Sequence, residues 1–359
     1  MKKVLFSILL IGAGTFAHAQ KSEVAAAKKE WGMFQLLGSN QPIEKSLESL
    51  NGGLKRTDAA ITHEKTKDLP ETWSYRALFA SAIAVTDTVN IQNSIEKQKI
   101  AEEAIAKTKQ LDTKGDEKDN LATAELNVNN ALKVRAFAAY NKQDFESALK
   151  YFNEVTARNP NDTAMYLNAG IMARNLKNYP ETIRNFKKVI SLNSPNAKDL
   201  YLEVINLNLA EVKDTVAAME TIKEASAKFP DEMSFIQSEA DLYIKKGDIA
   251  KSEEMLDKLI AKDPNNSVYQ YLKGDVYYLQ AVELQGKKNK LDPKNVKEAN
   301  AISTQMAGLL DKALPFYLKA AELDPKSAAA LEAQKRIYAF KNDTANYDKV
   351  SAKLKELNP

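Results

Sequence analysis

Apolar and polar positions alternate with a helical period through most of this 359-residue chain, and the helical stretches end at regular intervals. Residues 164–178 and 179–193 each carry apolar side chains three and four positions apart, which places them on one face of a helix. Proline ends a helix because it lacks a backbone N–H and disfavours helical geometry in the preceding residue. Prolines recur at nearly constant intervals, at Pro160, Pro195, Pro230 and Pro264. The pattern predicts helix pairs that repeat at this interval.

Small side chains recur at matching places of these predicted helices. In three first helices the small residue is Gly170, Ala240 or Gly274. Gly170 and Ala240 are about two repeat lengths apart, and Ala240 and Gly274 are one repeat length apart. In the second helices a small residue is followed four positions later by a larger apolar one, so both lie on one face. These second-helix pairs are Ala148 and Phe152, Thr182 and Phe186, Ala218 and Ile222, Ser252 and Leu256, and Ala313 and Tyr317. Helices that cross closely need such small residues at the contact.

These features resemble the tetratricopeptide repeat family, in which each unit of about 34 residues is a helix–turn–helix. The resemblance covers most of the chain after residue 19, and its style is similar to exported repeat proteins of Bacteroidetes. It implies an all-α fold, a right-handed α-solenoid of stacked helix pairs, since no single pair buries its apolar face alone. One departure lies in the repeat that begins near Ala197, where Asn206 stands at the expected place of the small residue.

Weaker copies of the pattern flank the central repeats. Residues 71–84 and 96–112 form one predicted pair, and residues 327–342 and 344–357 form the last pair. Upstream, a helical pair within residues 20–69 is predicted as a cap or a degenerate repeat. We therefore expect about seven helix pairs, with one solenoid domain over residues 70–359.

The repeat period breaks once, near the C-terminal end of the chain. The intervals from Pro264 to Pro325 and from Ser252 to Ala313 are equal, and each is nearly two repeats long where one repeat is expected. The extra residues predict an insertion at about 283–307, with two lengthened helices joined by a basic tip. The tip holds Lys287, Lys288 and Lys290. These lysines are either a solvated surface extension or a docking arm for an acidic partner or an anionic surface.

Residues 1–19 have the order of an export signal. A basic start, Met1 to Lys3, is followed by an apolar run and by Ala17 to Ala19, which fits a cleavage site before Gln20. A membrane anchor is the alternative, but the apolar run is shorter than the roughly 20 residues that span a bilayer. We expect a periplasmic or secreted protein, and no other segment is apolar enough to form a membrane span.

Composition narrows the possible chemistry. The chain has no cysteine, and His63 is the only histidine after residue 19. Thiol nucleophiles, His-paired triads and the usual zinc ligand sets are therefore excluded or nearly so, and we expect no catalytic, metal or cofactor site and no enzyme. Paired acids such as Glu102 and Glu103 are interpreted as solvated helix faces. After residue 19 the formal charge is about +1, which gives no electrostatic reason to expect a nucleic-acid partner.

The resemblance also implies where a partner binds. The family commonly binds peptides or proteins in a groove built from first helices, and here that face carries Gln237, Asp241, Tyr271, Asp275 and Tyr278. The family's clamp for a C-terminal carboxylate requires asparagines at positions that Phe137, Ile171, Asp241 and Asp275 occupy here, so this clamp is not expected. Asp241 and Asp275 lie one repeat apart at equivalent positions. They either bond neighbouring helices or line a groove for a basic or hydroxyl-rich segment.

The expected function is a periplasmic scaffold that joins protein or peptide partners in the cell envelope through this concave groove. The alternative is an envelope protein that binds a glycan or another small ligand on the same solenoid. The residues alone name neither the partner nor its pathway.

Overall fold

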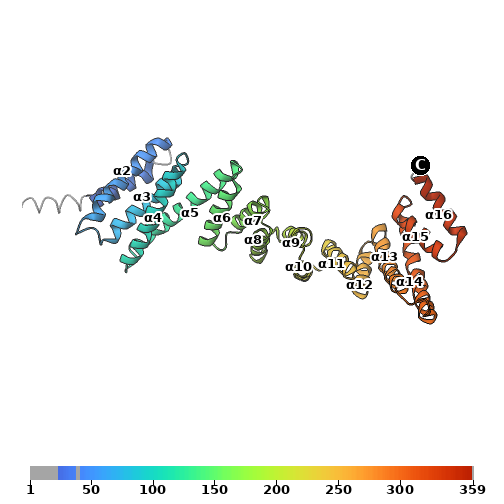
Figure 1. Cartoon of the computed structure of the whole chain (residues 1–359). Coiled ribbons are helices and arrows are strands. Elements are labelled where there is room, and N and C mark those ends of the chain that lie inside the picture. Colours follow the sequence, from blue (N-terminus) through green and yellow to red (C-terminus); the bar gives the residue numbers. More distant parts are fainter. Residues whose placement is uncertain (1–22, 38–40, 358–359) are drawn as a thin grey trace, which may run out of the picture. The chain divides into compact units, whose positions relative to one another are not determined.

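The structure, a computed structural model, describes residues 23–37 and 41–357. The predicted export signal and its cleavage site lie outside these residues. Every regular element in the described part is a helix, and no strand occurs there, which confirms the all-α prediction. The chain divides into two compact units, Met1–Ser194 and Pro195–Pro359 (Figure 1).

The first unit is a succession of antiparallel helices in which sequence neighbours pack side by side (Figure 1). It opens with a helix over residues 23–37, which belongs to the predicted N-terminal pair. The following helices are α2 (Ile43–Thr62), α3 (Pro70–Thr86), α4 (Ile91–Leu111), α5 (Lys118–Asn141), α6 (Phe145–Arg158), α7 (Thr163–Asn175) and α8 (Tyr179–Ser191).

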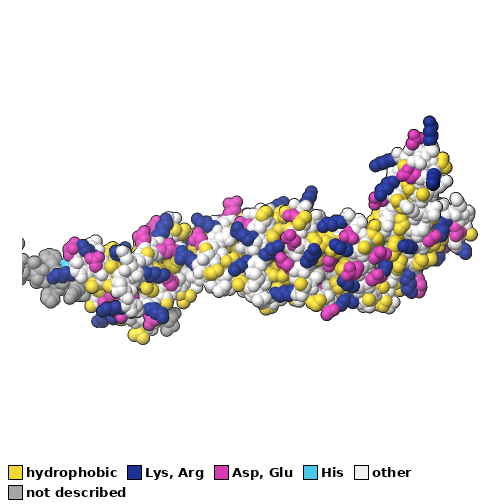
Figure 2. Space-filling view, turned by 90° about the horizontal axis from the view of Figure 1, so that it is seen from below, with side chains coloured by type: hydrophobic (Ala, Val, Ile, Leu, Met, Phe, Trp, Pro, Cys, Tyr) yellow, Lys and Arg dark blue, Asp and Glu magenta, His cyan; other side chains and the backbone are white. Residues whose placement is uncertain are grey.

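The second unit continues the same pattern of helix pairs. Its helices are α9 (Ala197–Asn206), a π-helical turn (Leu207–Val212), α10 (Thr215–Lys228), α11 (Met233–Lys246), α12 (Ile249–Lys262), α13 (Ser267–Lys288), α14 (Val296–Leu323), α15 (Ala328–Phe340) and α16 (Thr344–Leu357). No helix in residues 23–37 or 41–357 is both long and apolar enough to cross a membrane. Basic and acidic side chains are interspersed over the face that Figure 2 shows.

The repeated prolines stand where the sequence predicts, in the turns between pairs. Pro160, Pro230 and Pro264 each follow the last residue of a second helix by two positions. The opposite turns, between the two helices of a pair, use acidic or amide side chains as helix caps. The side chain of Asp248, for example, accepts the backbone N–H of Lys251 at 3.3 Å at the start of α12. Such caps satisfy N–H groups that have no partner inside the helix.

The predicted small residues lie at the closest helix contacts. A Cβ atom on Gly170 of α7 would overlap the ring of Phe186 of α8. A Cβ atom on Gly274 of α13 would stand 2.8 Å from the ring of Tyr317 of α14, which is completely buried. Aromatic side chains thus fill the space that the missing side chains leave, and this sets the distance between the paired helices.

The assignment of Asn206 to the small position is wrong. Asn206 is exposed, whereas Val204 is completely buried and stands seven residues after the start of its helix, as Gly170, Ala240 and Gly274 do in theirs. The larger Val204 side chain occupies the contact here. The helix then widens into the π-helical turn, and Lys213 adopts a left-handed conformation with a φ of 60°.

The predicted insertion takes the predicted form. α13 has 22 residues and α14 has 28, compared with 14 each in α11 and α12. We call the paired ends of α13 and α14, residues 283–307, the arm. Its inner face is apolar, with Leu284 and Ile302 packed against the buried Met306 and Leu310. Between residues 286 and 300 no side chain is fully buried, so the tip with Lys287, Lys288 and Lys290 is mostly open to solvent.

The glycine contacts generate a stability prediction. Gly170→Ala should lower the free energy of unfolding by about 1–3 kcal/mol, because the new methyl group overlaps the buried Phe186 ring. Urea unfolding followed by circular dichroism measures the change.

Gly52→Ala is the matched control in the same unit. Gly52 lies inside α2 with no atom within 4 Å of an added Cβ, so alanine should raise the stability by roughly 0.5–1 kcal/mol through helix propensity. Equal effects at the two glycines would refute the packing role of Gly170.

Candidate functional site

The candidate surface lies on the first helices of the pairs in the second unit. Asp241, Asp275 and Arg336 occupy equivalent places, each eight residues after the start of α11, α13 or α15. Their separations along the chain therefore equal the separations of the helix starts. α13 begins at a fixed point because the side chain of Asn266 accepts the backbone N–H of Val268 at 3.1 Å. Local capping therefore sets which residues of α13 reach this surface.

Asp275 is the centre of a polar and aromatic cluster. The Tyr317 hydroxyl donates to Asp275 Oδ1 at 2.6 Å, and Tyr271 is close enough to interact electrostatically with this carboxylate. The rings of Tyr271 and Tyr317 stand 5.5 Å apart. Burial raises the pKa of Asp275, while the two tyrosines and the nearby Arg336 partly oppose this rise. Burial and the Asp275 charge together hold the pKa of Tyr317 far above its ordinary value, so its hydroxyl stays a donor.

Arg336 joins the cluster from the next repeat. Its guanidinium interacts with Tyr278, and this interaction is the main reason that the pKa of Arg336 is raised. Arg336 was not predicted from the sequence. A signal for it exists, because Arg336 follows Asp275 by the same interval that separates Pro325 from Pro264. Sequence reasoning also missed the bond from Tyr317, which it placed only as a core residue. Asp275 therefore bonds a neighbouring helix, which is one of the two roles predicted for that position.

Asp241 differs from Asp275 in its surroundings. Its side chain is half-buried, yet its carboxylate has no hydrogen-bond or ion-pair partner among residues 23–37 and 41–357. Burial raises the pKa of Asp241, and the positive charge of Lys245 one turn away opposes the rise only in part. α11 thus presents a partly desolvated carboxylate that is free to accept hydrogen bonds from a partner.

The structure brings some of the predicted site residues together and keeps others apart. Tyr271, Asp275 and Tyr278 lie on one helix within the cluster described above. Gln237 is exposed on α11, one turn before Asp241. The three lysines lie at the far end of α13 and in the tip, and Lys287 is paired with Glu283 at 2.8 Å. Across the described part of the chain, no hydrogen bond or ion pair links these lysines to the Asp275 cluster.

The remaining chemical candidates serve structure. His63 caps the end of α2, where its Nδ1 accepts the backbone N–H of Lys65 at 3.2 Å. Glu102 is not simply a solvated acid, because it is half-buried and pairs with Arg158 of α6. Its neighbour Glu103 is exposed, as predicted. Nowhere in the described residues do three or more His, Asp or Glu side chains gather as a metal ion would require.

The raised pKa of Asp241 predicts a pH dependence of stability. The folded chain keeps this proton to higher pH than the unfolded chain, so the free energy of unfolding falls as pH rises from about 4 through the raised pKa. Asp241→Asn removes this fall. The variant should therefore gain stability relative to the natural protein between about pH 3.5 and about pH 7.5. Urea unfolding at several pH values measures the difference.

Asp231→Asn is the control, and it should give the opposite sign. Hydrogen bonding and charge from Lys262 lower the pKa of Asp231, so its contribution is present at neutral pH and is lost on acidification. The Asp231 variant should lose stability relative to the natural protein over the same rise in pH. The same sign for both variants would show that burial does not control Asp241.

Two family models match the chain, and both describe a tetratricopeptide repeat, over residues 134–197 and 209–276. Among curated proteins, the chain is similar to the mouse and human protein O-mannosyl-transferase TMTC3, with 26% identity over 172 and 162 residues. These matches cover 44% and 41% of this chain, but only 19% and 18% of the relatives. The chain thus spans about a fifth of the length of these curated relatives.

Solved structures of repeat proteins are also similar. A TPR repeats protein from Bacteroides fragilis NCTC 9343 is 20% identical, with a TM-score of 0.42, over 59% of this chain and 98% of that one. YrrB, described as a TPR protein with an unusual peptide-binding site, is 17% identical with a TM-score of 0.37, over 60% and 92% of the two chains. On the evidence of its helix pairs and of the two family models, the chain contains tetratricopeptide repeats, within residues 134–197 and 209–276.

Proposed function

We propose that this protein is a scaffold of the cell envelope that binds a segment of a partner protein on the first-helix surface of its second unit. The repeats themselves indicate a protein-interaction role. The segment carries basic or hydroxyl-bearing side chains, which donate to Asp241 and Asp275. We propose no catalytic step and no cofactor for this surface.

The observation that carries the proposal is the state of the two carboxylates. Burial raises the pKa of both, so each carboxylate stands in a place that disfavours its negative charge. Lys245 and Arg336 oppose this effect only in part. A Lys, Arg or hydroxyl side chain from a partner would offset the remaining cost, because hydrogen bonds to a charged carboxylate are among the stronger ones.

The existing bonds of Asp275 leave room for such a partner. An ionised carboxylate has about four acceptor positions on its two oxygens. The hydrogen bond from Tyr317 uses one of these positions. Asp241, one repeat earlier, keeps all of its capacity within the described chain. The exposed Gln237 adds an amide that donates and accepts, next to Asp241.

A capture experiment tests this proposal. The tagged protein that begins at Gln20 is incubated with the envelope fraction of the cells that produce it, at about 0.05 M and about 0.5 M salt. Partners captured by the natural sequence at low salt should be lost with Asp241→Asn combined with Asp275→Asn, and weakened at high salt because ions screen exposed charges.

Asp116→Asn combined with Asp119→Asn is the matched control. It makes the same change in net charge at two exposed carboxylates of the first unit and should leave capture unchanged. Undiminished capture by the Asp241 and Asp275 variant at both salt concentrations would rule out the carboxylate surface.

Residues 1–19 support the envelope location through their basic, apolar and small-residue order. We propose that they direct export and are then removed. The intact mass of the protein purified from its own cells should correspond to a chain that begins at Gln20. A mass that still includes Met1 to Ala19 would refute removal and, with it, the basis for the envelope location.

A further inference from the structure

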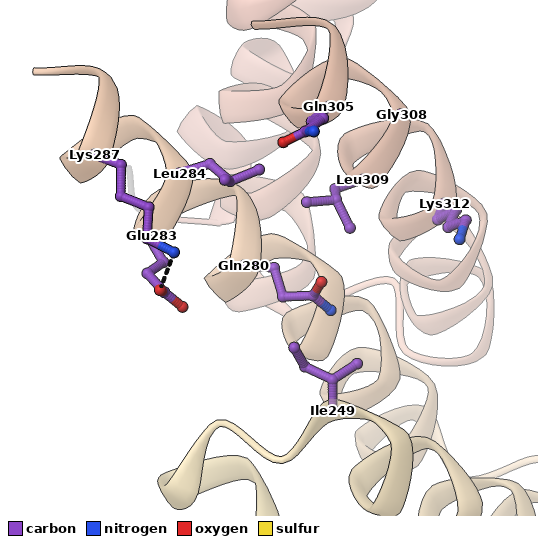
Figure 3. A pocket seen from close by; sticks show the side chains of 9 residues that line it. All are labelled: Ile249, Gln280, Glu283, Leu284, Lys287, Gln305, Gly308, Leu309 and Lys312. Atoms are coloured by element: carbon purple, nitrogen blue, oxygen red, sulfur yellow. Dashed lines mark ion pairs between the residues drawn. The ribbon is translucent and has the colours of Figure 1, made fainter. Parts of the chain in front are cut away.

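A second surface of the same unit is a cavity of about 500 Å³ between the arm and the start of α12. Its two walls are single faces of antiparallel helices. α13 contributes Gln280, Leu284 and Lys287, and α14 contributes Gln305, Leu309 and Lys312. On each helix these residues are spaced by three or four positions, so each wall is two turns long. We call this cavity the arm groove (Figure 3).

The arm groove has an apolar middle with one lysine on each side. Leu284 and Leu309 lie between Lys287 on one side and Lys312 on the other, and Ile249 of α12 closes one end (Figure 3). The apolar surface continues past Ile249, where the half-exposed Leu279 and Ile244 line a smaller adjoining hollow. From Val276 to Lys287 the combined hollow follows α13 for about 16 Å, or three helical turns.

The charges of the arm groove do not cancel. Lys287 is neutralised by Glu283, with 2.8 Å between Lys287 Nζ and Glu283 Oε1. Lys312 has no carboxylate within ion-pair distance in the described chain, and its ammonium lies 5.8 Å from the centre of the Tyr277 ring. One uncompensated positive charge therefore stands beside the apolar middle, and an occupant with a carboxylate complements it.

Gly308 keeps the arm groove open. It lies inside α14, where glycine lowers helix stability relative to alanine, and an added Cβ would meet no atom within 4 Å. The other glycine of this helix pair that lines a contact, Gly274, makes room for the Tyr317 ring, but no side chain of the described chain fills the space at Gly308. Gly308 lines the arm groove together with Gln305 and Leu309, so a larger side chain at this position would occupy part of its open side.

The shape selects a helix rather than a small molecule. A small ligand needs a site that encloses most of its surface, whereas Gln305, Gly308 and Lys312 are exposed along the open side. Helix-in-groove recognition uses apolar anchors at positions i, i+3, i+4 and i+7, which span two turns as these walls do. We propose that the arm groove binds an amphipathic helix of a partner protein, with Leu-type anchors on one face and Asp or Glu beside them.

A display selection tests this inference on the whole chain from Gln20. A random library of peptides of about four helical turns is selected on the natural protein, and the enriched peptides are synthesised with a fluorescent label. We expect net acidic sequences with leucines at helical spacing. Their dissociation constants, measured by fluorescence polarisation, should rise at least about tenfold for Gly308→Leu, which places a bulky side chain at the groove, and for Lys312→Glu, which reverses the charge.

Two control variants separate the arm groove from the rest of the surface. Gly286→Leu adds the same side chain on the arm outside the groove, where a Cβ also meets no atom within 4 Å. Lys349→Glu makes the same charge reversal at an exposed residue of α16. Both should leave binding within about twofold. Circular dichroism should show the natural fold for all four variants, because none of the four side chains is in the core. The two Gly→Leu variants should melt at or slightly above the natural protein, because leucine favours a helix more than glycine does.

Several outcomes would overturn the proposal. They are enrichment of basic or non-helical peptides, enrichment of none, or peptides whose binding survives Gly308→Leu. A concentration-dependent dimer that Gly308→Leu dissociates would instead assign the groove to a second copy of this chain. The Asp241→Asn and Asp275→Asn variant should still bind the selected peptides, so failure here is distinguishable from failure of the first-helix surface.

Discussion

Three of the close helix contacts depend on a glycine that faces an aromatic ring, because the missing side chain leaves room for the ring. Gly53 faces Phe79, Gly170 faces Phe186, and Gly274 faces Tyr317, and in every case a Cβ atom would stand within 3 Å of the ring. The rings of Phe79, Phe186 and Tyr317 are at most 2% exposed. A packed interior leaves little space to relax, so these contacts fix how near each pair of helices lies and where their other residues point.

The contact at Tyr317 also connects the core to the surface. The Tyr317 ring fills the space beside Gly274, while the Tyr317 hydroxyl donates to the carboxylate of Asp275, the residue that follows Gly274. Because the ring cannot move without opening a cavity, the carboxylate is held in one orientation by packing on another helix. The arrangement of Asp275, Tyr271 and Arg336 is thus a consequence of core geometry rather than of loop conformation. Preorganisation of this kind lowers the entropy lost when a partner binds.

The arm uses the same physics for a different result. Leu284, Ile302 and Leu309 extend the apolar seam between α13 and α14 beyond the usual repeat, so two long helices pack without needing a further helix pair. The next first helix, α15, begins almost two repeat lengths after α13, yet its residues occupy equivalent positions. The insertion therefore adds a surface without changing the repeat that follows it. Its base holds the arm groove, which Gly308 of α14 helps to line.

The sequence by itself determined the helix pairs, their turns, most of the small contact residues and the insertion. These features are local. Pro160 and Pro264 end helices, and a four-residue interval places Ala313 and Tyr317 on one helix face, independently of the rest of the fold. The resemblance to the repeat family also implied that Tyr271, Asp275 and Tyr278 share one surface. A local rule failed at Asn206, since the contact fell on Val204, two residues earlier.

Only the tertiary structure decided which of these side chains have partners. Tyr317 reaches Asp275 across 42 residues of sequence, and Arg336 reaches Tyr278 across the arm. Asp241 occupies the same repeat position as Asp275 but has no such partner within the described residues. The arm groove lies between helices that sequence alone shows only as two periodic stretches. The physical reason is that bonding and burial depend on distances between helices. Those distances are set by packing of the whole unit, whereas helix periods and turns are set within a few residues.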